Sequence, residues 1–413
     1  MHYMTAGESH GPQLTALVDG VPAGLRISEA SINADLARRQ SGYGRGGRMD
    51  IEADTARIVS GVRFGRTLGS PIALVVENRD WQNWAEDMAA FGDAPIGLHR
   101  ETTPRPGHAD LVGALKIDSD DCRDVLERAS ARETAARVAA AGIAREFLAD
   151  LGVEIFSYVT SIGQAQWIER DPMMEAPDYK PLEIEISDVR CPNEAASDAM
   201  RLEIEKAIEA GESLGGTFRV VVRGLVPGVG GYASRNERLS SRIGAALFSI
   251  PAIKGVEFGL GFEASHLPGS QVHDQIVLDR GNGFTRTSNN AGGLEGGMTT
   301  GMPLIVTCAM KPIPTLGAPL QTIDLDTLEP AAASTERSDV CAVPACAVVA
   351  ESEIAFELAN AYLEKFGHDN MTDIRAAVAA YKQRLRTAAK YCPRWLLKTK
   401  KGQPLIGWMV LDD

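Results

Sequence analysis

The segment from Ser130 to Leu151 is the strongest helix signal in the chain and the feature that most limits its fold. Its first four residues have the S-x-x-E pattern of a capping box, in which two side chains satisfy free amides of the first turn. Alanines and three larger apolar residues fill one face, and Gly152 supplies a C-terminal stop. The pattern predicts one long helix over residues 130–151.

Other segments divide between helix and strand signals in no regular order. Apolar runs bounded by turn residues predict strands at 14–18, 58–62, 71–76, 218–223, 256–261 and 304–310. Amphipathic spacing, caps and stops predict further helices at 28–39, 237–250 and 346–366. Because strands and helices do not alternate as βαβ units, we expect an α+β fold. No linker or low-complexity stretch divides the chain, so we expect one domain over residues 1–413.

Charge and cysteine usage exclude several classes of protein. The 42 lysines and arginines against 55 acidic residues give a net charge of -13, which disfavours binding to nucleic acid or an anionic membrane surface. Six scattered cysteines without metal-ligand spacing indicate reduced thiols and no metal site. The N-terminus has no signal or transit composition, and no long apolar run occurs. We therefore expect a cytoplasmic location.

Residues 38–48 contain four arginines and four glycines without one acidic residue. Arginine forks bind phosphate and carboxylate oxygens in pairs, and glycines let the backbone approach a ligand closely. For such a segment taken alone, a solvated flexible loop is as good an interpretation as an anion-binding site. RNA binding is a third, but only Tyr43 offers a stacking ring and the overall charge opposes it. A small polyanion is the favoured ligand.

A second glycine-rich segment, residues 288–301, has five glycines just before the apolar run 304–310 and Lys311. Glycine pairs at this density let a flat or bulky ligand lie directly on the backbone. The segment is neither a Walker loop nor a dinucleotide fingerprint, because both spacings are absent. It indicates a ligand without identifying one.

Two histidines, His10 and His108, lie in loops of small residues. Imidazole titrates near neutrality and is the usual group for handing over a proton, although a lone loop histidine is more often structural. Arg128 and Arg132 flank the start of the long helix, where free amides form an anion site, while Ser130 can also act only as a cap. Residues 336–341 form either an exposed loop or a further charged element.

Taken together, these segments resemble the chorismate synthase family in order and spacing. The match comprises the motifs GESHG, the Arg/Gly segment with IVSG, RPGHAD, RASARET, SIPAIKGVE, NNAGGLEGG, KPIPT and ERSDVC, over residues 4 to about 366. The resemblance implies a β-α-β sandwich with helices packed between antiparallel sheets, a homotetramer and bound flavin mononucleotide. Residues 367–413 are then a C-terminal extension.

The family's site residues carry over position by position. The resemblance implies flavin contacts at Arg128, Ala129, Ser130, Pro251, Ala252, Gly296, Lys311, Pro312, Ile313, Pro314, Thr315 and Arg337. It implies substrate contacts at His10, Arg39, Arg45, Arg48, Arg105 and Arg132, of which Arg39 and Arg45 also match positions for NADPH. Many members have Arg-His-Asp-Pro-Cys where this chain has Arg337-Ser338-Asp339-Val340-Cys341, so only the arginine, aspartate and cysteine carry over.

The reaction implied is the elimination of phosphate from 5-enolpyruvylshikimate-3-phosphate to give chorismate, with reduced flavin and no net redox change. We expect His10 to protonate the departing phosphate, His108 to protonate flavin near N1, and Asp339 to relay the proton gained at N5. NADPH or an external flavin reductase is the candidate source of electrons. The alternative function is an NADPH-dependent flavin oxidoreductase that shares the cofactor site.

Overall fold

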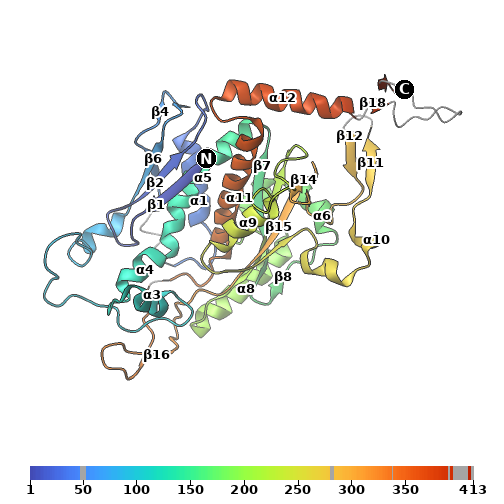
Figure 1. Ribbon diagram of the computed structural model, residues 1–413. Helices are drawn as coiled ribbons and strands as arrows, with labels where there is room; N and C mark the ends of the chain where they lie inside the picture. The colour runs from blue at the N-terminus through green and yellow to red at the C-terminus, as the bar shows by residue number, and fades with distance from the viewer. Residues whose placement is uncertain (47–52, 280–282, 337, 389–390, 394–407, 411–413) are drawn as a thin grey trace.

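The structure is a computed structural model that describes residues 1–46, 53–279, 283–336, 338–388, 391–393 and 408–410 (Figure 1). Within these ranges, no helix is long and apolar enough to cross a membrane.

Two antiparallel sheets form the outer layers of the core. The first has the strand order β1-β2-β6-β3, with β1 His2–Ala6, β2 Gln13–Asp19, β6 Ile72–Glu77 and β3 Ala56–Ile58. The second has the order β10-β15-β9-β7-β8, with β10 Ile253–Phe258, β15 Leu304–Met310, β9 Gly216–Arg223, β7 Glu154–Ile162 and β8 Ala165–Gln166. In β2 every second residue is buried, as expected of a strand with one face on the core.

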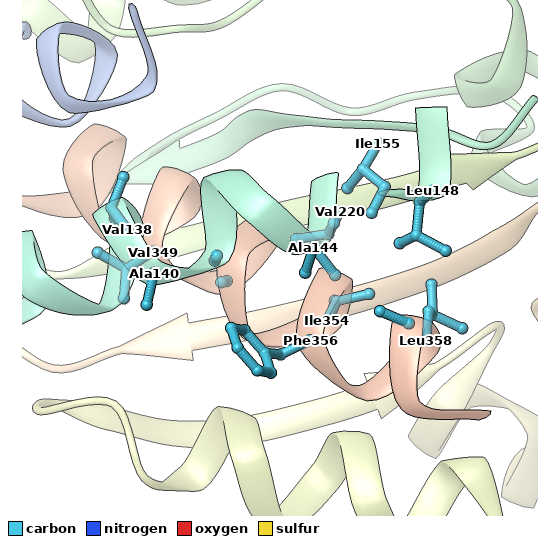
Figure 2. Close-up of a cluster of buried hydrophobic side chains, with 14 of the residues drawn as sticks. Val138, Ala140, Ala144, Leu148, Ile155, Val220, Val349, Ile354, Phe356 and Leu358 are labelled. Carbon is cyan, nitrogen blue, oxygen red and sulfur yellow. The ribbon is translucent and has the colours of Figure 1, made fainter. Parts of the chain in front are cut away.

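Four helices fill the space between the sheets: α1 Glu29–Gln40, α5 Thr134–Asp150, α9 Leu239–Phe248 and α11 Val343–Phe366. Helix α5 packs on β2 and β6 of the first sheet, whereas α11 packs on β7 and β9 of the second, and the two helices contact each other. Figure 2 shows this contact, where Ala144 and Leu148 of α5 face Ile354 and Leu358 of α11. The arrangement confirms the predicted α+β class with helices between antiparallel sheets.

Glycine at position 142 allows α1 to approach α5 closely. A Cβ atom there would lie 2.7 Å from Cγ1 of Ile32, a buried residue of α1. The alanines of α5 serve the same purpose along the rest of the helix, since ten of its residues from Thr134 to Ala144 are buried. The small-residue face that marked this segment in the sequence is therefore a packing surface.

Smaller elements decorate these layers. Short antiparallel hairpins are formed by β4 Val62–Arg63 with β5 Arg66–Thr67, β11 Ile276–Asp279 with β12 Gly283–Arg286, β13 Leu294–Glu295 with β14 Met298–Thr299, β16 Gln321–Ile323 with β17 Pro330–Ala332, and β18 Tyr391–Pro393 with β19 Trp408–Val410. The other α-helices are α3 Asp110–Ile117, α4 Arg123–Ala129, α6 Pro172–Glu175, α7 Pro181–Ile186, α8 Glu194–Ala210, α10 Gly269–Val272 and α12 Met371–Ala388. Single 3-10 turns occupy Arg79–Asn83, Ala131–Glu133, Ala176–Asp178 and Gly261–His266.

Most predicted elements differ from the structure by one to three residues at an end, for example the strand predicted at 256–261, which spans Ile253–Phe258, and the helix predicted at 237–250, which spans Leu239–Phe248. Two differences have a clear physical cause. The strand expected over residues 58–62 is interrupted, because Gly61 turns the chain with φ +80° between β3 and β4. The long helix begins at Thr134, after a 3-10 turn that Ser130 caps through the amide of Arg132. The capping box is not formed as predicted, since the Glu133 carboxylate accepts a hydrogen bond from Thr5 Oγ1 at 2.6 Å.

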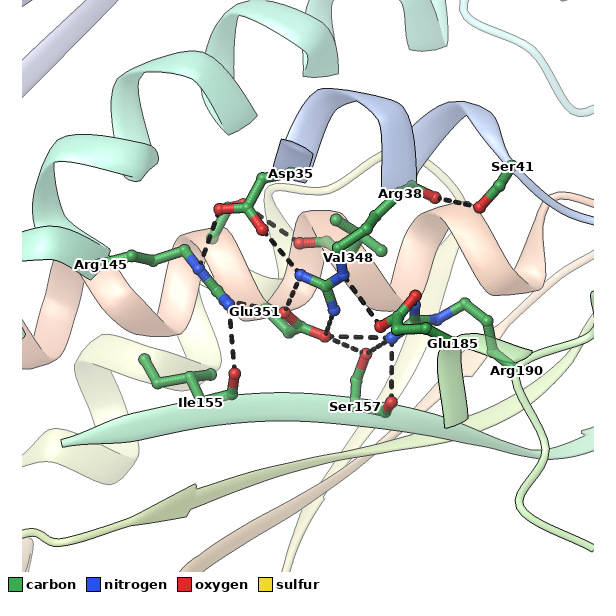
Figure 3. Close-up of polar contacts among 11 residues, drawn as sticks. Asp35, Arg38, Ser41, Arg145, Ile155, Ser157, Glu185, Arg190, Val348 and Glu351 are labelled. Atoms are coloured by element: carbon green, nitrogen blue, oxygen red, sulfur yellow. Dashed lines mark hydrogen bonds and ion pairs between the residues drawn. The ribbon is translucent and has the colours of Figure 1, made fainter. Parts of the chain in front are cut away.

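A buried ionic network joins α11 to α1, α5 and β7 (Figure 3). Glu351 is fully buried and accepts hydrogen bonds from Arg38 at 2.8 and 2.9 Å and from Arg145 at 2.8 Å, and Arg190 lies 3.3 Å away. Burial raises the pKa of Glu351, but the three arginines outweigh it and lower the pKa to about 2. The network fixes the C-terminal part of α1, where the Arg/Gly segment begins.

Candidate active site

The loop between β1 and β2 holds His10 against helix α4. His10 is 8% exposed, and its Nδ1 lies 2.8 Å from Oε1 of Glu127, while its backbone N–H donates to Oε2 at 2.8 Å. The indole of Trp84 stacks on the imidazole with ring centroids 4.1 Å apart. Ser130, at the end of α4, donates to Ser9 Oγ at 3.2 Å. The first histidine and the predicted anion site at Arg128–Arg132 are thus neighbours.

Asn78, which follows β6 directly, joins this loop to Arg132. Its side-chain amide donates to the carbonyl oxygens of Gly11 at 2.7 Å and Glu8 at 3.2 Å. Its Oδ1 accepts from Nε and Nη2 of Arg132 at 3.0 and 2.8 Å. Sequence reasoning missed Asn78, although a polar amide directly at the end of a predicted strand was an available signal.

Arginines from the first glycine-rich segment lie beside Arg132. Arg132 donates to Asp54, and Arg39 Nη1 lies 3.7 Å from the second oxygen of the same carboxylate. Arg45 Nη1 lies 2.9 Å from Oδ2 of Asp339. The pKa of Arg39 is lowered to about 10, chiefly by burial. Asp54 raises this pKa, whereas Arg45 and Arg132 lower it further. Since Arg39 stays cationic at neutral pH, three arginines face two aspartates, and the group carries an excess of positive charge.

The second histidine lies at the start of α3 in a separate hydrogen-bonded group. His108 Nδ1 bonds to Asp110, which is fully buried and also accepts from Arg105 Nε at 2.8 Å. Burial raises the pKa of Asp110, but hydrogen bonds from His108 and Arg105 outweigh it and hold the pKa well below its usual range. Arg105 Nη1 donates to Thr315 Oγ1 at 3.0 Å, so the His108 loop contacts the KPIPT segment.

The predicted flavin residues lie around these two groups. Lys311 donates through Nζ to the carbonyl of Gly107 at 2.5 Å and through its backbone N–H to Ala252 at 2.9 Å. Burial, aided by Lys254, lowers the pKa of Lys311. Arg128 donates to the carbonyls of Thr5 at 2.9 Å and Gly7 at 3.1 Å. The segments carrying Lys311, Ala252 and His108 are thus in direct contact.

The loop before α11 approaches both the arginine group and the His108 group. Glu336 lies 3.6 Å from Arg105 and Asp339 lies 2.9 Å from Arg45. These two acidic residues are three positions apart, so their Cα atoms are separated by at most about 11 Å. The group of Arg39, Arg45 and Arg132 and the group of Arg105, His108 and Asp110 therefore border the same segment.

Some predicted site residues are not tied to either group. Arg48 and Arg337 lie outside the described residues. Pro251 and Gly296 make no described polar contact with either histidine group, and Gly296 lies in the turn between β13 and β14 with φ +60°. A groove of about 870 Å³, lined by Met1, Arg242 and His368 among others, contains none of the predicted site residues.

No metal centre is visible in the described ranges. There, no group of three or more histidine, cysteine, aspartate or glutamate side chains could hold a metal ion.

Comparisons with known proteins agree with one another. The sequence model of the chorismate synthase family matches residues 1–363. Chorismate synthase 1 of Bacillus cereus is 52% identical over 398 residues, covering 94% of this chain and 100% of that protein. Chorismate synthase of Bacillus subtilis (strain 168) is 52% identical over 385 residues, covering 92% and 97%. A crystal structure of chorismate synthase superimposes with a TM-score of 0.77 at 41% identity, covering 94% and 98%.

The fold, the charged groups and these likenesses define a carbon-oxygen lyase of aromatic biosynthesis. The family resemblance in the eight sequence motifs is confirmed. The chain belongs to the chorismate synthase family.

Proposed function

We propose that this chain converts 5-enolpyruvylshikimate-3-phosphate to chorismate by anti-1,4-elimination, with reduced flavin mononucleotide and without net redox change. The phosphate leaves with the electron pair of its C–O bond, and a hydrogen leaves the other end of the allylic system. The observation that carries the proposal is the group of Arg39, Arg45 and Arg132, in which three cations face two aspartates beside the His10 loop.

Those arginines are suited to the charge of the substrate. The ester carries a phosphate and two carboxylates, and burying such an anion requires fixed cations. Arg132 is held by Asn78 and Asp54, and Arg39 donates to Thr134 Oγ1 at 3.2 Å, so the guanidinium groups are already oriented. Arg105, and Arg48 outside the described residues, are proposed as further substrate contacts.

His10 is proposed as the acid that protonates the departing phosphate. Its Nδ1 faces Glu127, so the nitrogen that gives the proton is Nε2. General acid catalysis of this kind contributes about 10²- to 10⁴-fold to a rate. His108, whose Nδ1 is held by Asp110, is the proposed donor of a second proton, to the flavin near N1. Asp339 is proposed to relay the proton gained at N5.

The proposed flavin residues are drawn from several segments. At Gly296, which has no described polar contact with the two histidine groups, a Cβ atom would meet no atom within 4 Å, so the backbone there borders open space that a flat ring can approach. Lys311 and Arg128 supply cations for a phosphate tail, and Ala129, Ser130, Pro251, Ala252, Pro312, Ile313, Pro314, Thr315 and Arg337 complete the proposed set. When bound, reduced flavin supplies an electron-rich ring that lends charge to the allylic system as phosphate leaves.

Assembly and location are part of the same proposal. We propose one domain over residues 1–413, a homotetramer, and a cytoplasmic enzyme. Five cysteines are free and buried, in keeping with a reducing compartment: Cys122, Cys191, Cys308, Cys341 and Cys346. NADPH, at Arg39 and Arg45, or an external flavin reductase is the proposed source of electrons.

An anaerobic assay with chemically reduced flavin tests the function. We expect chorismate to form with no reductant consumed per turnover, and no product to form without flavin. Full activity in the absence of flavin would contradict the proposal. Stoichiometric NADPH oxidation would favour the alternative, a flavin oxidoreductase that shares this cofactor site.

A further inference from the structure

His10 and three other side chains form a closed ring of contacts. Glu127 accepts from His10 and from Arg123, whose Nη1 lies 3.0 Å from Oε1. The guanidinium of Arg123 lies over the ring of Trp84, with its central carbon 4.9 Å from the centroid. Trp84 in turn stacks on His10. The four side chains come from the His10 loop, helix α4 and the turn that follows residue 83.

The Glu127 side chain accepts hydrogen bonds and donates none. It is 3% exposed. Burial raises its pKa, but hydrogen bonds from His10 and the charge of Arg123 outweigh burial and lower the pKa. A carboxylate offers only acceptor atoms, so the proton between the two side chains sits on Nδ1 of His10. One residue thereby determines which imidazole nitrogen is free to react.

Trp84 limits the ring's rotation and its access to water. Its indole plane is inclined by only 28° to the imidazole and covers one face of it. The indole N–H donates to Asp80 Oδ2 at 3.2 Å, and Arg123 lies over the same indole. Both contacts hold Trp84 in the orientation that packs on His10.

We infer that Glu127, Arg123 and Trp84 are positioning residues that hold one proton of His10 on Nδ1, so that the protonated imidazole carries its second, transferable proton on Nε2 and presents it to the substrate. The inference rests on the proposed role of His10 as the acid for the departing phosphate. Other charged groups near the loop are Glu8, two positions from His10, and Arg132, which acts through Asn78. Neither has a described contact with the imidazole itself.

Tryptophan fluorescence tests the ring without any turnover. An imidazole held in contact with an indole quenches the emission of that indole, so the stacking of His10 on Trp84 can be read at one fixed pH. We expect His10→Gln to raise the emission relative to wild type, and the same substitution in a Trp84→Phe background to change it little, which assigns the difference to Trp84 among the five tryptophans. Equal emission from wild type and His10→Gln would overturn the stacking and with it the inference.

Anaerobic kinetics test the positioning by Glu127. Glu127→Gln places an amide, which can donate, opposite Nδ1 and disturbs the proton placement. We expect kcat to fall about 10²- to 10⁴-fold, with little change in KM for the ester, because a proton donor is lost while the arginines remain. Trp84→Phe should retain most of kcat, because a ring still packs on His10, whereas Trp84→Ala should not.

Glu353→Gln is the matched control, because Glu353 is also a buried carboxylate paired to an arginine but lies on α11 beside Tyr3 and Arg137. It should leave kcat unchanged. Wild-type kcat in Glu127→Gln would contradict the inference. Full activity in His10→Gln would instead remove His10 from the proposed mechanism. The fluorescence experiment would still test the stacking of Trp84 on His10, because it does not depend on activity.

Discussion

Asp339 binds both the side chain of Arg45 and the backbone next to it. Its Oδ2 lies 2.9 Å from Arg45 Nη1, and its Oδ1 accepts from the N–H of Gly46 at 2.7 Å. The contact is so close that a Cβ atom on Gly46 would lie 2.7 Å from the carbonyl oxygen of Ser338. One carboxylate therefore connects the loop before α11 to the Arg/Gly segment.

Asp339→Asn separates two roles of this carboxylate, the relay of a proton and the anchoring of Arg45. The amide retains an acceptor for Gly46 but cannot carry the proton, so we expect kcat in the anaerobic assay to fall about 10²-fold or more. Ser338→Ala, one position away, should behave as wild type. A normal kcat with a raised KM for the ester would show that Asp339 only anchors Arg45.

Asp110→Asn removes the buried negative charge shared by His108 and Arg105. We expect the free energy of unfolding at pH 7 to fall by about 3 kcal/mol, since one partner of a buried charged pair is lost. The folded-state pKa of Asp110 is depressed, so its contribution is present above an unfolded value of about 4 and is lost as the pH falls below that. Urea denaturation of both proteins should show a difference that narrows below about pH 4. A constant difference would contradict the assignment.

Glu351→Gln tests the network of Figure 3. The change leaves the buried Arg190 and the partly buried Arg38 and Arg145 with one acceptor fewer, and we expect a loss of about 3–5 kcal/mol in unfolding free energy. The pKa of Glu351, about 2, is depressed, so its contribution is complete above about pH 4.3 and is lost as the pH falls towards 2. The control is Glu154→Gln in the exposed pair with Arg223, which should cost less than about 1 kcal/mol. Equal losses would refute the special role of burial.

Two helical glycines should respond to alanine with opposite signs. Gly142→Ala places a methyl group 2.7 Å from Ile32, and we expect thermal unfolding to reveal a loss of about 1–3 kcal/mol. Gly244 lies in α9, where an added Cβ meets no atom within 4 Å. Gly244→Ala should therefore stabilise the protein by about 0.5–1 kcal/mol. The same sign for both would contradict the packing described between α1 and α5.

Local sequence patterns predicted most elements of the core, because their signals lie within a few residues of each other. The strand 304–310 has the predicted bounds, and the helix over 346–366 begins only three residues earlier than expected. The errors arose where a distant contact decides the conformation. Glu133 bonds to Thr5, 128 positions away, and so does not close the capping box.

The partners of the candidate site were harder to predict than the residues they hold. His10 stood out because imidazole is the usual proton donor near neutrality and because its loop carries a motif of the family, yet Glu127 lies 117 positions away and belongs to no charged pattern of its own. Asp54 and Trp84 were missed for the same reason. Pairings of this kind depend on how the sheets and helices meet, and a single sequence does not contain that geometry.

The central position of α11 also affects how the protein emerges from the ribosome. Every strand of both sheets precedes residue 343, while the helix that covers the inner faces of β7 and β9 is made last among the four helices between the sheets. Until residue 366 has left the exit tunnel, these faces and the small-residue side of α5 lack their partner. Folding must therefore be completed late, and nascent chains shorter than this expose apolar surface that chaperones bind.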